Sequence, residues 1–191
     1  EPGKLWQQTT FPREIGLAIA AESDKNGWPI STSAGEFTYY RRLPDQSLGE
    51  FKPGRFAVAS NAETIPVDPL RIVTWDAVAA AHIAAYVEVN YTNECKLSRF
   101  LYEDRRLRSI TVTAPGASKG DALRFVAAKL AIPLENTLAI GDGHTDLTMF
   151  AVAGVSVAMG NGLEEIREAS DYIAPTNDNA GVAWAVDQFV C

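Results

Sequence analysis

A lysine and two aspartates in the last third of the chain have the spacing to hold a phosphate and a divalent metal. Residues 137–146 (TLAIGDGHTD) are a short apolar run that ends in Gly141-Asp142, followed by Asp146. Such a run predicts a strand that delivers Asp142 to the carboxyl edge of a parallel sheet, where α/β proteins place their ligands. Lys119 lies upstream, just before another helical pattern. A cation and two carboxylates on adjacent loops favour joint binding of metal and phosphate.

A regular alternation of helices and strands after residue 115 predicts one α/β unit. Helices are expected at residues 121–131, 147–152, 163–169 and 181–190, and strands at residues 137–140, 155–159 and 172–174. The strands are nearly all apolar, which indicates that helices cover both faces of the sheet. Leu123, Val126 and Leu130 share one face of the first helix, and Asn177, Asp178 and Asn179 are expected to cap the last one.

The first 114 residues have a different order of elements. A helix followed by two strands occurs twice, once before and once after a central insertion. Helices are expected at residues 12–24 and 76–90, strands at residues 4–10, 28–32, 37–42, 55–60, 70–75, 96–102 and 107–113, and a loop at residues 43–54. The stretch Ala114-Pro115-Gly116-Ala117 breaks both patterns and predicts a linker. Two domains are therefore predicted, residues 1–114 and residues 115–191.

The motifs of the second domain resemble those of the haloacid dehalogenase superfamily. They are Ser118-Lys119-Gly120, the segment AIGDGHTD at residues 139–146, VAMGNG at residues 157–162, Asp171-Tyr172-Ile173 and Asn177-Asp178. More narrowly, the chain resembles the Cof-type hydrolases with a type IIB cap, which are relatives of sucrose-phosphate phosphatase. The resemblance implies an α/β fold. Residues 115–191 would be the C-terminal half of a Rossmann-like core, and residues 1–114 an α+β type IIB cap.

The resemblance also implies roles for individual residues. Asp142 would be a direct Mg²⁺ ligand, and Lys119 would stabilise the charge of the nucleophile and of the transferring phosphoryl group. Asp146 would complete the metal site, or instead orient Lys119 or a metal-bound water. Thr145 and Asn161 are candidate substrate contacts, although Thr145 stands where the family usually has Asn.

One motif of the family is missing from this sequence. The family begins with a strand that ends in Asp-x-Asp, whose first Asp is the nucleophile and whose second is the acid/base. No segment of the chain matches, and the nearest imitation, Asp76 after an apolar run, is better explained as a helix N-cap. We therefore expect the nucleophile in an N-terminal segment that this sequence lacks. The chain alone would be inactive, and it would self-associate or pair with that segment through the strand at residues 137–140.

The function implied is that of a Mg²⁺-dependent phosphatase, a phosphoric monoester hydrolase acting on small phosphorylated metabolites such as sugar phosphates. The route would be an aspartyl-phosphate that water hydrolyses. Two alternatives stay open: a phosphosugar mutase of the same superfamily, and a catalytically inactive fragment that binds phosphorylated metabolites. Release of phosphate, rather than of an isomerised product, would distinguish the phosphatase from the mutase.

The amino-acid composition of the chain argues against some classes of binding partner. The net charge of −7 argues against a nucleic-acid surface, and no apolar run reaches the roughly 20 residues of a membrane helix. The two cysteines are too few for a disulfide framework, so a reducing cytoplasm is expected. The loop at residues 160–162 lacks the third glycine of a dinucleotide site, and residues 116–120 lack the order of a P-loop.

The remaining charged candidates have simpler explanations in the sequence. His144 is expected in an exposed loop, and His82 is expected to be structural within an Ala-rich helix. A solvated strand face explains a group of arginines better than an anion site does: Arg99, Arg105, Arg106 and Arg108.

Overall fold

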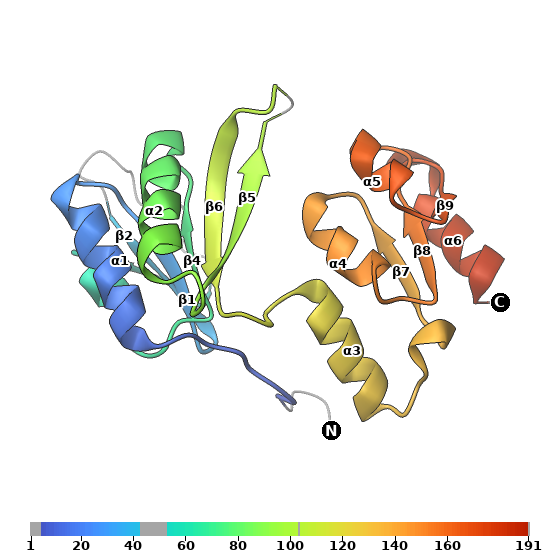
Figure 1. The fold of residues 1–191 in the computed structure, drawn as a ribbon, viewed down its shortest axis with the longest axis horizontal. Coiled ribbons are helices and arrows are strands. Elements are labelled where there is room, and N and C mark those ends of the chain that lie inside the picture. The colour runs from blue at the N-terminus through green and yellow to red at the C-terminus, as the bar shows by residue number, and fades with distance from the viewer. Residues whose placement is uncertain (1–4, 43–52, 103, 191) are drawn as a thin grey trace. The chain divides into compact units, whose positions relative to one another are not determined.

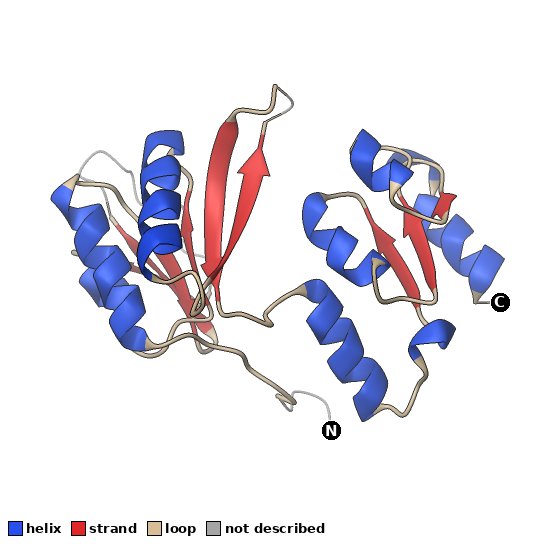
Figure 2. Ribbon diagram, viewed as in Figure 1, coloured by secondary structure: helices blue, strands red, loops and turns tan. Residues whose placement is uncertain are grey.

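The computed structural model of the chain describes residues 5–42, 53–102 and 104–190. The chain divides into two compact units, Glu1–Pro115 (unit 1) and Gly116–Cys191 (unit 2). Each unit has its own sheet, shown in red in Figure 2. The division falls within the stretch 114–117, where Gly116 has a φ of 77° that glycine adopts at no steric cost.

Unit 1 is a six-stranded sheet with two long helices over it. The strand order is β3-β2-β1-β4-β6-β5, and every pair is antiparallel except β2 and β3. The strands are β1 (Ser31–Ala34), β2 (Phe37–Arg41), β3 (Arg55–Val58), β4 (Arg71–Thr74), β5 (Lys96–Leu101) and β6 (Leu107–Thr113). The helices α1 (Arg13–Lys25) and α2 (Ala77–Asn90) lie side by side, and α2 packs on β4 and β6 (Figure 1).

Unit 1 has a core of aliphatic side chains between these helices and the sheet. Ile72 and Val112 of the sheet and Ile83 and Val87 of α2 are all buried. Asp76 caps α2, since its carboxylate accepts a hydrogen bond from the Ala79 amide at 2.8 Å. The sequence prediction for Asp76 is thus confirmed. Cys95 is also buried, and this burial is the main cause that raises the pKa of its thiol to about 11.

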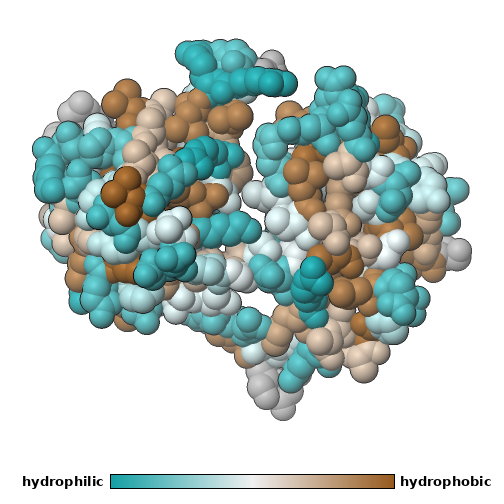
Figure 3. Space-filling view, in the orientation of Figure 1, coloured by the Kyte–Doolittle hydropathy of each residue, from teal (hydrophilic) through white to brown (hydrophobic). Residues whose placement is uncertain are grey.

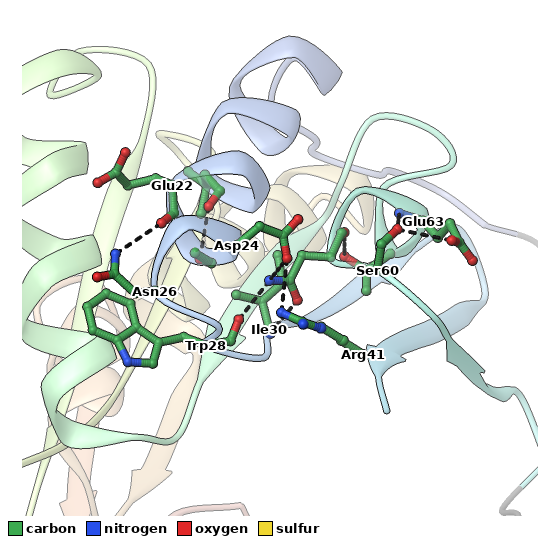
Figure 4. A network of polar contacts seen from close by, with 12 residues as sticks. Glu22, Asp24, Asn26, Trp28, Ile30, Arg41, Ser60 and Glu63 are labelled. Carbon is green, nitrogen blue, oxygen red and sulfur yellow. Dashed lines mark hydrogen bonds and ion pairs between the residues drawn. The ribbon is translucent and has the colours of Figure 1, made fainter. Parts of the chain in front are cut away.

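A buried asparagine holds one corner of unit 1 together. Asn61, which precedes the 3₁₀ helix η1 (Ala62–Thr64), donates to Asp24 Oδ1 at 2.8 Å and to the Trp28 carbonyl at 2.7 Å. It accepts from the Ile30 amide at 3.0 Å. Figure 4 shows Arg41 of β2 reaching the same Asp24 carboxylate, at 3.0 Å. A fully buried amide is tolerated here because it is satisfied from several sides.

Unit 2 is a parallel three-stranded sheet, in the order β7-β8-β9, with helices on both faces. Its strands are β7 (Leu138–Gly141), β8 (Val155–Ala158) and β9 (Tyr172–Ile173). Its α-helices are α3 (Lys119–Lys129), α4 (Leu147–Phe150), α5 (Glu164–Glu168) and α6 (Gly181–Phe189), with 3₁₀ turns η2 (Leu134–Asn136), η3 (His144–Asp146) and η4 (Asn177–Asn179). One core cluster joins Ala139 and Ala158 to Phe150 and Ile166, and another joins Val157 to Ala185. The predicted fold class, an α/β core with a mixed α+β cap, is confirmed.

Three local predictions are wrong. Residues 5–10 form no strand, and residue 4 of that prediction lies outside the described residues, as do residues 43–52 of the predicted loop. In α3, Gly120 and Ala127 are buried, whereas Val126 and the C-cap residue Leu130, which belong to the apolar face noted in the sequence, are exposed. Residues 177–179 form η4, and the cap position of α6 is Ala180, with no side-chain cap bond.

Exposed apolar side chains also occur elsewhere on both units. On the face shown in Figure 3, hydrophobic side chains in brown are scattered among hydrophilic ones. Among the described residues, no helix is both long enough and apolar enough to span a bilayer.

β7 is an edge strand, and we expect it to make the 191-residue chain self-associate. Within the described residues, β7 pairs with β8 alone, so one row of its backbone groups has no strand partner. An uncovered edge recruits other strands. Light scattering should therefore show a mass that rises with concentration. A monodisperse monomer whose amides at residues 137–140 are protected from hydrogen exchange would contradict this expectation.

Candidate active site

The predicted site residues of unit 2 gather where β7 and β8 end. Asp142 directly follows β7, and its carbonyl accepts from the Leu163 amide at 3.2 Å, which ties it to the loop after β8. A Cβ on Gly162 of that loop would lie 3.2 Å from the Asp142 Cα. The segments that carry Asp142 and Asn161 therefore meet at one edge of the sheet.

Asp146 is a buried carboxylate with both oxygens engaged. Its side chain is 4% exposed. Oδ2 accepts the amides of Asp142 and Gly143, each at 3.0 Å, and Oδ1 accepts Lys119 Nζ at 2.5 Å. Through these contacts, Asp146 holds both the turn after β7 and the side chain of Lys119 in place. They favour the interpretation that Asp146 orients Lys119 over the one in which it ligates metal.

The pKa of Asp146 follows from these contacts. Burial raises it, because desolvation disfavours the charged carboxylate. The hydrogen bonds from Lys119 and from the amides of Gly143 and Asp142 act in the opposite direction and prevail, so that the pKa lies below its ordinary value. Asp146 is therefore an anion throughout the neutral range.

Lys119 is the first residue of α3, and its side chain is half exposed, at 52%. The sequence pattern predicts that this helix begins at residue 121, two residues after its start in the structure. Ser118 is the N-cap, and it forms a capping box with Asp121 in which Ser118 Oγ accepts the Asp121 amide at 3.1 Å. A cation in the first turn opposes the helix dipole. The ion pair with Asp146 offsets that cost and fixes the ammonium at the site.

Two glycines make the approach of Lys119 and Asp146 sterically feasible. A Cβ on Gly120 would lie 2.0 Å from the Thr148 carbonyl oxygen, and a Cβ on Gly141 would lie 2.4 Å from the Asp146 Cβ. Neither clash can be relieved by rotating a flexible side-chain end. The close packing of α3 on α4 and of β7 on η3 therefore depends on glycine at both positions.

Thr148 is a positioning residue that sequence reasoning missed. Its hydroxyl accepts the Gly120 amide at 3.1 Å and donates to the Thr145 carbonyl at 2.9 Å. It thereby joins the first turn of α3 to the turn that contains Asp146. The only signal in the sequence is a hydroxyl residue beside a helix start, and hydroxyls are common there.

The other predicted residues lie near this cluster with different contacts. Thr145 is half-buried, and its hydroxyl has no hydrogen bond among the described residues. Asn161 Oδ1 accepts the Asn177 amide at 2.8 Å, so this residue supports the loop before α6. His144 Nδ1 lies 2.7 Å from Glu165 Oε1, which gives the histidine a surface partner.

Asp142 is the one carboxylate of the cluster that remains available to a metal. It is exposed, and its side chain has no hydrogen bond or ion pair within the described part of the chain. Among those same residues, no group of three or more His, Cys, Asp or Glu side chains could enclose a metal. Mg²⁺ retains waters and binds through one or two carboxylates together with substrate phosphate, so a single free carboxylate fits it.

Comparison with known proteins shows which proteins this chain resembles. Residues 3–186 match the model of the haloacid dehalogenase-like hydrolase family. The chain is 43% identical over 82 residues to the 5-amino-6-(5-phospho-D-ribitylamino)uracil phosphatase YcsE of Bacillus subtilis, covering 43% of this chain and 33% of that protein. It is 51% identical over 67 residues to the phosphatase YwpJ of the same organism, covering 35% and 24% respectively. These matches span a third or less of either relative.

Solved structures agree in fold over nearly the whole chain. A haloacid dehalogenase-like hydrolase from Bacteroides thetaiotaomicron superposes with a TM-score of 0.78 at 23% identity, covering 97% of this chain and 70% of that one. The subclass IIB sugar phosphatase BT4131 superposes with a TM-score of 0.75 at 22% identity, covering 95% and 68%. At such identities the likeness establishes the fold alone. Since the family model spans nearly the entire sequence, this chain belongs to the haloacid dehalogenase-like hydrolases.

Proposed function

We propose that the protein is a Mg²⁺-dependent phosphatase that hydrolyses small phosphorylated metabolites, with sugar phosphates among its substrates. The observation that carries the proposal is the half-exposed Lys119 ammonium, held 2.5 Å from the buried Asp146 carboxylate beside an unpaired Asp142. A fixed cation next to a free carboxylate suits a phosphate bound together with a metal. The phosphatase names of YcsE and YwpJ support the same reaction class.

In this proposal Asp142 holds the metal. Its exposed carboxylate would be one of few protein ligands, with water and substrate phosphate as the others. Mg²⁺, when bound, supplies positive charge to the phosphoryl oxygens. The backbone of Asp142 is fixed through its amide, which donates to Asp146, and through its carbonyl, which accepts from Leu163.

Lys119 provides a second positive charge that needs no metal. Asp146 keeps the ammonium in place, and about half of the lysine side chain stays open to solvent. A pre-oriented ammonium stabilises negative charge that grows on the phosphoryl oxygens during transfer, with little reorganisation at the moment of reaction. Asp146 itself acts through Lys119 and the two loop amides, as a positioning residue.

The nucleophile of the proposed reaction lies outside this sequence, which contains no Asp-x-Asp pair. The aspartyl-phosphate route forms a bond from an aspartate oxygen to phosphorus while the ester oxygen leaves, and water then hydrolyses the acyl phosphate. We accordingly propose that the 191-residue chain alone releases no phosphate from p-nitrophenyl phosphate. Assays of the site residues need the protein with its nucleophile-bearing segment.

In that protein, Asp142→Ala should lower kcat by about a hundredfold or more, because it removes one of few metal ligands. Phosphate release at a series of Mg²⁺ concentrations measures the effect, and a chelator should reduce the parent protein to the level of the variant. Asp187→Ala, an exposed aspartate of α6, is the matched control and should leave kcat unchanged. Near-normal turnover of Asp142→Ala at ordinary Mg²⁺ would contradict the assignment.

Lys119→Ala should reduce kcat far more than it raises KM, since the charge acts chiefly in the transition state. Lys119→Arg should restore only part of kcat, because a planar guanidinium does not replace a compact ammonium. Lys129→Ala, in the last turn of the same helix, is the control. If Lys119→Ala altered the unfolding midpoint and left kcat intact, the lysine would be structural.

Asp146 should also make stability depend on pH in a predictable direction. Its folded pKa is lowered, so its contribution is complete above the unfolded value of about 3.9 and is lost as the pH falls through the folded pKa. The difference in urea midpoint between the parent chain and Asp146→Asn should thus be constant from about pH 7 to pH 5 and shrink below about pH 4. A difference that does not vary with pH would argue that the ion pair with Lys119 contributes nothing.

A further inference from the structure

Helix α2 is apolar on its outward face as well as on the face that packs on the sheet. Its inner side chains are buried, as expected of a helix that covers a sheet. On the opposite side Val78 is 68% exposed and Val89 is 82% exposed, and Ala81 and Ala85 between them are exposed too. A surface helix of a globular protein normally carries charged and polar residues on that side. The outward side of α2 therefore has the composition of a contact surface.

An exposed tryptophan extends this apolar surface beyond the N-terminal end of the helix. Trp75 stands immediately before the N-cap residue of α2 and is 61% exposed. Tryptophan is enriched among the residues that contribute most to binding between proteins, because its large ring buries much area when it is covered. We call the surface made by five residues the α2 face: Trp75, Val78, Ala81, Ala85 and Val89.

The α2 face presents no unpaired charge to a partner. Within α2, all of which the structure describes, only His82 and Glu88 can carry a charge near neutral pH. His82 Nε2 lies 2.8 Å from Glu22 Oε1 of α1. Glu88 Oε1 lies 2.6 Å from a terminal nitrogen of Arg99 of β5. Since α2 contains neither Lys nor Arg, it lacks the cations by which amphipathic helices bind anionic lipid, and another protein surface is the partner that fits.

The order of side chains along the α2 face is self-complementary. Valines stand near both ends with alanines between them, and the midpoint between Val78 and Val89 lies between Ile83 and Ala84. If a second copy of the helix is placed antiparallel about a two-fold axis at that midpoint, Val78 of each copy faces Val89 of the other. The small alanines then meet in the middle, where they allow the helix axes to approach to about 8 Å. A second copy of this chain therefore matches the α2 face along its length.

We propose that the α2 face joins two copies of this chain about a two-fold axis, with their α2 helices antiparallel. The helix is about 21 Å long, and α1 beside it widens the layer to about 20 Å (Figure 1). Half-buried Leu17 and exposed Ala21 of α1 continue the apolar surface. Such a layer offers each copy a flat area of about 400 Å², which is the size of a weak and reversible contact. Neither Lys119 nor Asp142 takes part, so the contact is independent of the proposed hydrolysis.

The test is disulfide formation between thiols placed at the two ends of the α2 face, in chains that also carry Cys191→Ser. A mixture of Val78→Cys chains and Val89→Cys chains should form a covalent dimer under mild oxidation, because these positions face each other across the axis. Equal positions lie about 16 Å apart along the helix. Since a disulfide needs Cα atoms within about 7 Å, either variant alone should give at least about fivefold less dimer. Non-reducing electrophoresis and peptide mapping measure the yield and identify the joined residues.

Adding Ala85→Glu to both chains should lower the yield of the mixed dimer by more than about tenfold, because it places a carboxylate of each copy against an apolar surface near the axis. Ala85 is exposed and Glu favours helix, so the chain should fold normally. Val182→Glu, at an exposed valine of α6, is the matched control and should leave the yield unchanged. A yield that Ala85→Glu does not lower would overturn the proposal. A yield as high in the single variants as in the mixture would also overturn it, and is the result expected if copies join through the edge of β7 alone.

Discussion

The arrangement of unit 2 depends on one buried carboxylate. Asp146 accepts hydrogen bonds from two amides of the turn after β7 and from the ammonium of Lys119. It therefore fixes both the backbone of Asp142 and the first turn of α3. An ionised group in such a position is stable because each oxygen is satisfied. The contacts require the close approaches at Gly120 and Gly141, so residues without a catalytic group still determine the site.

Much of the architecture follows from local signals in the sequence. Asp76 before an Ala-rich run gives the start of α2, and the alternation of residues 107–113 gives the bounds of β6. The three strands of unit 2 are short apolar runs placed between helices, a pattern with few alternatives. The family motifs lie in the loops that these elements place at one sheet edge, and the structure brings Lys119, Asp142 and Asp146 together there, as the sequence predicts.

The failures of prediction share a different physical origin, since each depends on contacts between distant residues. Residues 4–10 are expected to form a strand, but a strand forms only with a partner, and pairing is not encoded locally. Val126 and Leu130 follow a helical period, yet α3 turns its small residues inward to approach α4. Arg71 and Lys96 come to lie on either side of Thr113 only through the register of β4, β6 and β5. The register of paired strands brings together residues that lie far apart in the sequence.

Because Cys95 is buried, the rate at which its thiol reacts can measure local unfolding of unit 1. The thiolate is the reactive form of cysteine, and a thiol with a pKa of about 11 at 6% exposure is almost entirely protonated and shielded at neutral pH. Alkylation of Cys95 in a chain carrying Cys191→Ser therefore has to wait for a fluctuation that exposes the end of α2 and the start of β5. The labelling rate, compared with that of the unfolded chain, converts directly into the free energy of that local opening.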